Sequence, residues 1–196
     1  VLRVRNLTHA HAFRDINFEL KNGEILGVTG LLGDGRSELF QAIFGAGQIS
    51  SGTIFLEGTA VKIHSTEQSL NLGIGYLPRN RKENGIIKDM SILENASIVT
   101  WPLFAKLGVI NKKRQVELFE EQRRRLAIRL QKSTDNINTL SGGNQQKVVL
   151  GKWLPANPKV LILDNPTQGV DVGAKEEIYD IIAKLAEEGM AIVVLS

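Results

Sequence analysis

The sequence predicts an α/β fold built on a mainly parallel sheet, and three observations support this. Near the N-terminus, a short strand pattern at residues 25–27 leads into a glycine-rich loop and then into helical spacing at residues 37–44. Toward the C-terminus, helical and strand patterns alternate, as expected of a parallel sheet. Between about residues 91 and 140 the strand signals disappear and polar stretches with helical spacing replace them. We therefore expect an α/β core with a helical insert.

The individual elements follow from these patterns. Ile16, Phe18 and Leu20 alternate with polar residues, so the N-terminal side is expected to form strands of an antiparallel β subdomain. The turn-forming segment GAGQISSG (45–52) precedes two more strand candidates, TIFL and GIGYL. We assign residues 1–85 and 141–196 to the core and residues 86–140 to the helical insert. The later part of the core is expected to form a helix at about 142–154, a strand at 160–163, a helix at 174–188 and a strand at 191–195.

Composition excludes several classes of protein. A chain of 196 residues that is 42% hydrophobic can bury one substantial core. It has no cysteine, which excludes disulfides and thiolate metal sites. Its apolar runs are far shorter than the roughly 18 residues of a membrane span, and we find no signal peptide. The formal charge is only +3, and Arg123 to Arg125 follow two glutamates, which is typical of a solvated helix face. Nucleic acid is therefore not an expected partner, and any link to a membrane would come through another protein.

The two ends suggest a piece of a longer protein. The chain begins at Val1 without a methionine and stops at Ser196, directly after the strand pattern AIVVL. We expect the C-terminal end of the domain to be missing.

A phosphate-binding loop is predicted at GLLGDGRS (30–37), which differs by one residue from GxxxxGK[ST]. In such loops, backbone N–H groups surround phosphate oxygens and the following helix directs its positive end at them. Arg36 stands where lysine is expected; it keeps the charge, but its larger planar group is expected to impair transition-state positioning more than binding. A glycine-rich turn that merely joins a strand to a helix is the alternative. The residues expected to contact the nucleotide are Gly30, Leu31, Gly33, Asp34, Gly35, Arg36, Ser37 and Glu38, with Ser37 also holding Mg²⁺.

A second metal ligand is predicted at the end of VLILD (160–164). An apolar strand that ends in aspartate presents a carboxylate to Mg²⁺ in nucleotide-binding proteins of this kind, so Asp164 is the candidate, although strands ending in aspartate are common. The next residue is often a glutamate that activates water, and here it is Asn165. An amide accepts no proton at neutral pH, and losing a general base typically lowers a rate by about 100- to 10,000-fold.

A second glycine motif, LSGGNQQK (140–147), opens a helix that Ser141 can cap and whose first amides can meet an anion. A simple helix cap is the alternative. LSGGNQ resembles the signature motif of ATP-binding cassette (ABC) ATPases. GLLGDGRS precedes it and VLILDNPTQGVD follows it, in the order of that family, and the resemblance covers essentially the whole chain.

The resemblance implies a P-loop core and a head-to-tail pair of cassettes that hold ATP and Mg²⁺ between them. By this resemblance, Ser141 and Gly143 would contact the γ-phosphate bound by a partner cassette, and Asp171 would lie at the seam. More narrowly, GEILGVTGLLGDGRSEL, NRK, SGGNQQKVVL and PTQGVDVGAK look like the second half of tandem monosaccharide importers, with nucleoside importers close behind. Arginine is common at the position of Arg36 in that group.

Two positions depart from the family pattern. Arg79 replaces a glutamine or acidic residue and cannot ligate Mg²⁺, and Asn165 replaces the glutamate. With Arg36, they fall on the hydrolytic machinery of the chain's own loop, while the signature motif is intact. The hypothesis is a degenerate half that holds ATP and completes a hydrolytic site on its companion. The alternatives are a clamp that senses ATP without hydrolysis and a soluble cassette acting on DNA or ribosomes.

The resemblance also implies partners and a place in the cell. The companion cassette is expected to be the N-terminal half of the same protein, bound to a membrane permease at the cytoplasmic face of the plasma membrane, with an extracytoplasmic solute-binding protein as an indirect partner. Residues 83–87 are the candidate contact with the permease. His11 and Phe13 are candidates to stack on adenine, and the switch residue would be at position 197, beyond the chain. The sequence does not specify the transported solute.

Overall fold

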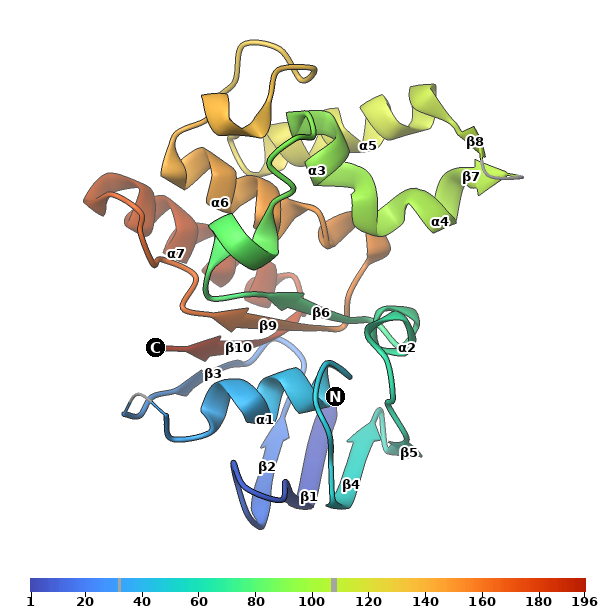
Figure 1. The fold of residues 1–196 in the computed structure, drawn as a ribbon, viewed down its shortest axis with the longest axis vertical. Coiled ribbons are helices and arrows are strands. Elements are labelled where there is room, and N and C mark those ends of the chain that lie inside the picture. The colour runs from blue at the N-terminus through green and yellow to red at the C-terminus, as the bar shows by residue number, and fades with distance from the viewer. Residues whose placement is uncertain (32, 107–108) are drawn as a thin grey trace. The chain divides into compact units, whose positions relative to one another are not determined.

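The structure is a computed structural model that describes residues 1–31, 33–106 and 109–196 (Figure 1). Leu32, inside the predicted phosphate loop, lies outside the described residues. Contacts divide the chain into two compact units. Unit 1 comprises Val1–Tyr76, Pro158–Asn165 and Ile182–Ser196, and unit 2 comprises Leu77–Asn157 and Pro166–Ile181. The predicted limits of the helical insert, 86 and 140, stay a prediction.

Unit 1 contains the predicted parallel sheet. Its strand order is β3-β10-β9-β6, with bounds Ile25–Val28, Ala191–Leu195, Val160–Asp164 and Ile74–Leu77. Strand β10 runs parallel to both neighbours, and Leu195 is in register with Val28 on one side and with Asp164 on the other. Strand β9 is buried along its whole length, as its unbroken apolar run VLIL predicts. The carboxyl ends of three strands therefore meet at one edge.

An antiparallel sheet forms the rest of unit 1, in the order β2-β1-β4-β5. The bounds are Ile16–Leu20, Leu2–Thr8, Ser51–Leu56 and Thr59–Val61. Helix α1, Arg36–Ile43, packs between the two sheets (Figure 1). The Phe40 ring lies 5.7 Å from that of Phe18 on β2, and Phe44 stacks at 5.3 Å on Tyr76 of β6. The predicted antiparallel subdomain is confirmed, and α1 is fixed by aromatic contacts on both sides.

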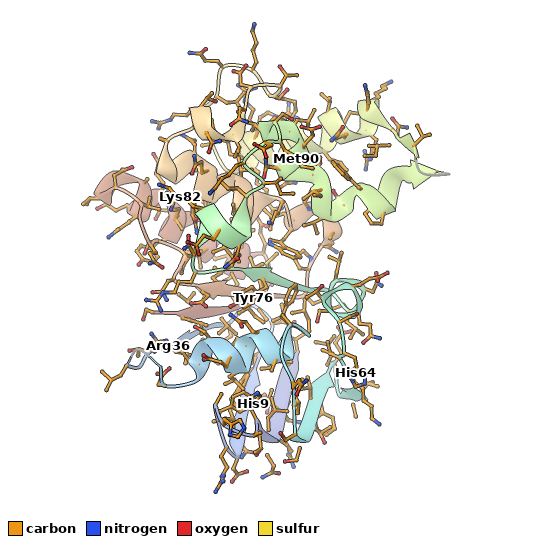
Figure 2. All side chains as sticks on the ribbon, viewed as in Figure 1. His9, Arg36, His64, Tyr76, Lys82 and Met90 are labelled. Atoms are coloured by element: carbon orange, nitrogen blue, oxygen red, sulfur yellow. The ribbon has the colours of Figure 1, made fainter. Side chains whose placement is uncertain are left out.

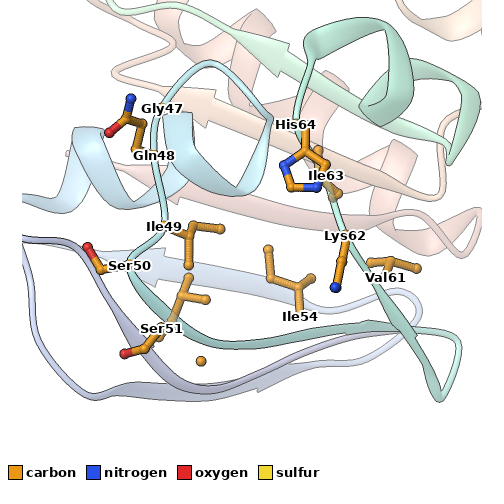
Figure 3. A pocket seen from close by; sticks show the side chains of 12 residues that line it. Gly47, Gln48, Ile49, Ser50, Ser51, Ile54, Val61, Lys62, Ile63 and His64 are labelled. Carbon is orange, nitrogen blue, oxygen red and sulfur yellow. The ribbon is translucent and has the colours of Figure 1, made fainter.

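Two further features of unit 1 were not expected from the sequence. A short helix α2, Thr66–Asn71, is capped by the Ser65 side chain, which accepts from the Gln68 N–H at 3.2 Å. Beside the antiparallel sheet, a hollow of about 590 Å³ is lined by residues 47–52 and 61–64 together with Leu7 and Ile54 (Figure 3).

Unit 2 is mostly helical, as predicted for residues 91–140. Its α-helices are α3 (Ile92–Ser97), α4 (Trp101–Phe104), α5 (Lys112–Arg125) and α6 (Gly142–Gly151), and α7 (Val172–Glu187) begins in it and ends in unit 1. Short 3-10 turns cover Ile98–Thr100, Ile137–Thr139 and Leu154–Ala156, and a π-helical turn covers Arg81–Gly85. A two-residue strand pair, β7 (Ala105–Lys106) and β8 (Val109–Ile110), corrects the expectation that this region has no strands. Two residues are too few to produce a period-two pattern.

Local signals explain where the helices of unit 2 begin. Ser91 and Glu94 form a capping box at α3, in which Ser91 Oγ accepts from the Glu94 N–H and the Glu94 carboxylate accepts from the Ser91 N–H at 2.8 Å. The Asn111 side chain caps α5 by accepting from the Arg114 N–H. Among residues 1–31, 33–106 and 109–196, no helix has both the length and the apolar character needed to cross a bilayer.

A buried lysine lies at the C-terminal end of α6. Lys152 is 9% exposed, and its Nζ donates to the Gly85 carbonyl at 2.8 Å. Burial lowers the pKa of Lys152 from 10.5 to about 8, since the apolar surroundings disfavour the charged amine.

This lysine should make the stability of the chain depend on pH. Between about pH 8 and pH 10.5 the unfolded chain binds more protons at Lys152 than the folded chain, so the free energy of unfolding rises with pH there. Compared with Lys152→Met, the wild-type chain should gain about 1.4 kcal/mol per pH unit between pH 8 and pH 10 and nothing below pH 8. Urea unfolding of both proteins at several pH values measures this, and a constant difference across the range would contradict it.

Candidate functional site

The candidate site lies at the carboxyl edge of the parallel sheet in unit 1. The Ser196 N–H donates to the Val28 carbonyl at 3.1 Å, and the Asn165 N–H donates to the Leu195 carbonyl at 3.0 Å, so the ends of β3, β10 and β9 are tied together. Neighbouring strands lie about 4.8 Å apart, which places the end of β9 roughly 10 Å from the end of β3. The glycine loop leaves β3 at this edge. Open α/β sheets bind ligands at this kind of edge.

The glycines of the loop are required by its conformation. Gly33 and Gly35 have φ angles of 84° and 88°, in the left-handed region that disfavours side chains. A Cβ on Gly35 would also collide with the carbonyl oxygen of Ala12. Gly35 is the N-cap of α1, and no side chain of the described residues caps it. The first turn of α1 therefore offers N–H groups to an anion.

Arg36 turns back onto its own loop. Its Nη1 donates to the Leu31 carbonyl at 2.8 Å and to Asp34 Oδ2 at 2.8 Å, while the Arg36 N–H donates to Asp34 Oδ1 at 3.1 Å. These contacts, the main-chain one first, lower the pKa of Asp34. The Asp34 carboxylate reaches across to Gly30, where an added Cβ would overlap it. The loop thus pairs its cation internally.

One donor of Arg36 remains unused. Its Nε is buried and has no hydrogen-bond partner in the described part of the chain. The position of Arg36 at the start of α1 is visible in Figure 2. A phosphate oxygen would satisfy this donor together with the main-chain amides, so the residues present fit a nucleotide phosphate.

Asp164 is held at the end of β9 by two side chains. It is 1% exposed, and the Tyr76 hydroxyl donates to its Oδ2 at 3.0 Å and Asn165 Nδ2 donates to its Oδ1 at 3.1 Å. Burial, followed by the negative charge of Asp164, raises the pKa of Tyr76 above its usual value, and Glu38 of α1 acts in the same direction. Since the Tyr76 ring stacks on Phe44, which directly follows α1, the Asp164 carboxylate bonded to Tyr76 lies on the face of the sheet that α1 covers. Each carboxylate oxygen keeps a lone pair, so Ser37 and Asp164 fit a hard cation such as Mg²⁺.

Asn165 occupies the position of the expected base. Its φ angle is 48°, a left-handed value that asparagine tolerates better than most residues, and its amide donates to Asp164. This geometry gives Asn165 an anchoring contact with Asp164 and no proton-accepting group.

An aromatic cluster adjoins the phosphate loop within unit 1. His9 Nδ1 accepts from the N–H groups of His11 and Ala12 at 3.1 Å each. The His9 ring lies 5.6 Å from Phe13 and 6.4 Å from His11. Because Ala12 lies against Gly35, this cluster is next to the start of α1. Adenine stacking by His11 or Phe13 stays a prediction.

In unit 2 the structure gathers the other predicted residues around the start of α6. Ser141 caps α6, and its Oγ accepts from Asn144 Nδ2 at 3.0 Å. An added Cβ on Gly143 would lie 2.5 Å from Ala174 Cβ, and Asp171 Oδ1 accepts from the Ala174 N–H at 2.9 Å. The signature residues and Asp171 therefore converge on the start of α7. Arg79 Nε donates to the Gln168 side chain at 3.2 Å, on the same approach to α7.

Sequence reasoning missed three contributors to these sites. Tyr76 holds the carboxylate of Asp164, His9 organises the loop before Gly35, and Arg81 contacts Gln145, Gln168 and Gly169. Tyr76 could have been suspected as a hydroxyl in the otherwise apolar strand pattern GIGYL. Arg81 belongs to the NRK segment that carries the resemblance, but its contacts join residues 64 to 88 positions apart. The contacts of His9 depend on loop conformation, so no local pattern indicates either set.

Known proteins with similar sequences belong to the family that the motifs of this site resemble. The family described as ABC transporter matches residues 13–168. The ribose import ATP-binding protein RbsA of Bacillus licheniformis is 43% identical over 196 residues, covering all of this chain and 40% of the relative. The protein of the same name in Bacillus subtilis is 41% identical with the same coverage. The chain thus spans about 40% of the length of these relatives.

Solved structures share the fold. A nucleotide-free ATP-binding cassette from an ABC transporter superposes with a TM-score of 0.85 at 22% identity, covering 100% of this chain and 81% of that one. A dimeric post-hydrolysis cassette with ADP and Pi bound gives a TM-score of 0.80 at 21% identity, covering 100% and 88%. The family match over residues 13–168, together with the phosphate loop, Asp164 and the signature helix, shows that the chain is an ATPase domain of the ABC transporter family.

Proposed function

We propose that this chain is a nucleotide-binding domain of a monosaccharide importer, which holds ATP and Mg²⁺ at a degenerate site and completes a hydrolytic site on a companion cassette. The observation that carries the proposal is an asymmetry. Arg36, Arg79 and Asn165 alter the hydrolytic positions of the chain's own site, whereas Ser141 and Gly143 keep the family pattern. The names of the relatives support sugar import, with ribose as their stated solute.

The nucleotide site of this chain is proposed to bind phosphate better than it catalyses phosphoryl transfer. Main-chain amides at the start of α1 and the unused Arg36 Nε would hold phosphate oxygens. Ser37 and Asp164 would hold Mg²⁺, which neutralises phosphate charge when it is bound. Asn165 already donates to Asp164 and has no basic atom for the proton of an attacking water. This site would therefore bind ATP but hydrolyse it slowly.

The other half of the proposal concerns unit 2. Ser141 is exposed at the N-terminus of α6, where the helix dipole and the amides favour an anion. In this proposal the anion is the γ-phosphate held by the companion, and Asp171 lies at the same seam. ATP would close the pair, and product release would open it.

The partners follow from the same proposal. The companion is the N-terminal half of the same protein. A permease lies in the membrane and contacts residues 83–87. An extracytoplasmic solute-binding protein delivers the sugar. The cassette would then work at the cytoplasmic face of the plasma membrane as a peripheral subunit.

Asp34 should weaken nucleotide binding at the own site. Its carboxylate pairs with Arg36 at 2.8 Å and adds a negative charge where phosphates would bind. Asp34→Asn keeps the shape and removes the charge, so we expect affinity for Mg-ATP to rise about ten-fold. Titration calorimetry of the chain measures this, with Glu67→Gln, an exposed carboxylate on α2, as the control. Unchanged or weaker binding in Asp34→Asn would contradict the role of the pair.

Hydrolysis should require the companion. The chain alone should bind Mg-ATP with negligible turnover, and a protein that carries both cassettes should hydrolyse ATP. In that protein, Ser141→Arg should lower turnover at least 100-fold, because a bulky cation displaces the γ-phosphate contact. Ser133→Arg, in the loop before α6, is the matched control and should retain turnover.

Phosphate release assays separate this proposal from its rival. A sensing clamp that never supports hydrolysis would show no turnover with or without the companion. Rapid hydrolysis by the chain alone would contradict the degenerate site.

A further inference from the structure

Arg81 is the most buried arginine described in unit 2, and none of its partners is a carboxylate among the described residues. It is 7% exposed. Its Nη1 donates to the Gln168 carbonyl at 2.8 Å and its Nη2 donates to the Gly169 carbonyl at 3.0 Å. Burial lowers the pKa of Arg81 below its usual value, but arginine remains charged at neutral pH. A buried guanidinium thus donates to the main-chain carbonyls of two consecutive residues.

The two carbonyls belong to the segment that leads to Asp171. Gly169 has a φ angle of 66°, so the chain turns there in a left-handed conformation before α7 begins. Two parallel donors of a planar guanidinium can fix the direction of both peptide groups at once, which a single amine cannot do. Arg81 therefore sets the path of this turn.

The same side chain reaches the signature helix. Its Nε donates to Gln145 Oε1 at 3.4 Å, and Gln145 Nε2 in turn donates to the Leu140 carbonyl at 3.2 Å, directly before Ser141. An added Cβ on Gly142 would lie 2.7 Å from Arg81 Nη2 and 3.1 Å from the Gly169 carbonyl oxygen. The start of α6, the turn at Gly169 and the guanidinium are therefore in direct contact.

Arg81 lies on a short turn that contacts α6. It opens the π-helical turn Arg81–Gly85, and Lys82 on the same turn is labelled in Figure 2. An added Cβ on Gly85 would lie 3.2 Å from Val149 of α6, and Lys152 at the end of α6 bonds to the Gly85 carbonyl. The turn thus lies along α6 and is held at both ends.

We infer that Arg81 is the positioning residue that fixes the Ser141 loop and the Gln168–Asp171 turn in one geometry, so that both are presented together to the companion cassette. The inference rests on the proposed donation of Ser141, but its structural part concerns this chain alone. Arg79 does not duplicate the role, since its Nε donates to the side chain of Gln168 and not to the main chain.

The test uses the protein that carries both cassettes, with Arg81→Met and Arg81→Lys, and Arg123→Met as the control. Arg123 is an arginine of the same unit whose Nη1 bonds to Glu120 Oε2 on its own helix α5, so its loss matches Arg81→Met in side chain and charge without removing a described bond to the Arg81–Gly85 turn. Two quantities are measured: hydrogen–deuterium exchange of peptides covering 141–145 and 166–171, and steady-state ATP turnover with its kcat and KM. Thermal unfolding identifies any variant that does not fold.

We expect Arg81→Met to exchange at least ten-fold faster in both peptides and to lose about ten- to 100-fold in kcat, since small misplacements of a catalytic group have effects of that size. KM for ATP should change less than three-fold, because the own phosphate loop is untouched. Arg81→Lys keeps the charge but loses the paired donors, so it should fall between wild type and Arg81→Met in both measurements. Arg123→Met should stay within two-fold of wild type in both peptides and in kcat.

The outcomes separate this inference from the proposed function. Wild-type exchange at 166–171 in Arg81→Met, or wild-type exchange and turnover in Arg81→Lys, would overturn the positioning role. Faster exchange with unchanged turnover would support the positioning role and instead contradict the donation of Ser141 to a hydrolytic site.

Discussion

Main-chain N–H groups at the start of α1 are the feature on which the nucleotide site depends. Gly33 and Gly35 precede this helix in left-handed conformations, and no described side chain caps Gly35. The helix therefore exposes its positive end at the edge where three parallel strands finish. Asp164 reaches that edge because β9 is in register with β10, and Tyr76 holds its carboxylate from β6. The buried apolar strands thus place one anion-binding group and one cation-binding group at the same edge.

Charge within the loop modifies what this arrangement can do. Arg36 supplies a positive charge where the family has lysine. Asp34 accepts from the Arg36 main-chain N–H and from its Nη1, and its negative charge offsets part of the arginine charge. Asn165 uses its amide to support Asp164. Binding groups are retained while the groups that would speed phosphoryl transfer are neutralised or replaced. The signature helix has no such alterations, and the buried guanidinium of Arg81 ties it to the turn before Asp171.

The sequence predicted the fold well because its patterns are local. The alternation at residues 16–20, the apolar run 160–164 and the helical spacing after Ser37 correspond to β2, β9 and α1. The short pair β7 and β8 and the π-helical turn Arg81–Gly85 were not predicted, since each is too short to repeat a residue pattern. Motif spacing located Gly30 to Ser37, Asp164 and Ser141, because phosphate loops and helix caps need particular residue types at fixed intervals. The Tyr76 bond to Asp164 joins residues 88 positions apart, and the Arg81 bonds to Gln168 and Gly169 span similar distances, so no window of sequence contains them.

The most direct test of the account is a crystal structure of the chain with Mg²⁺ and a non-hydrolysable ATP analogue. We expect the phosphates against the amides at the start of α1, the metal between Ser37 and Asp164, and Arg36 turned from Asp34 toward a phosphate oxygen. An analogue bound elsewhere with the Asp34–Arg36 pair intact, or a metal that contacts neither Ser37 nor Asp164, would contradict it.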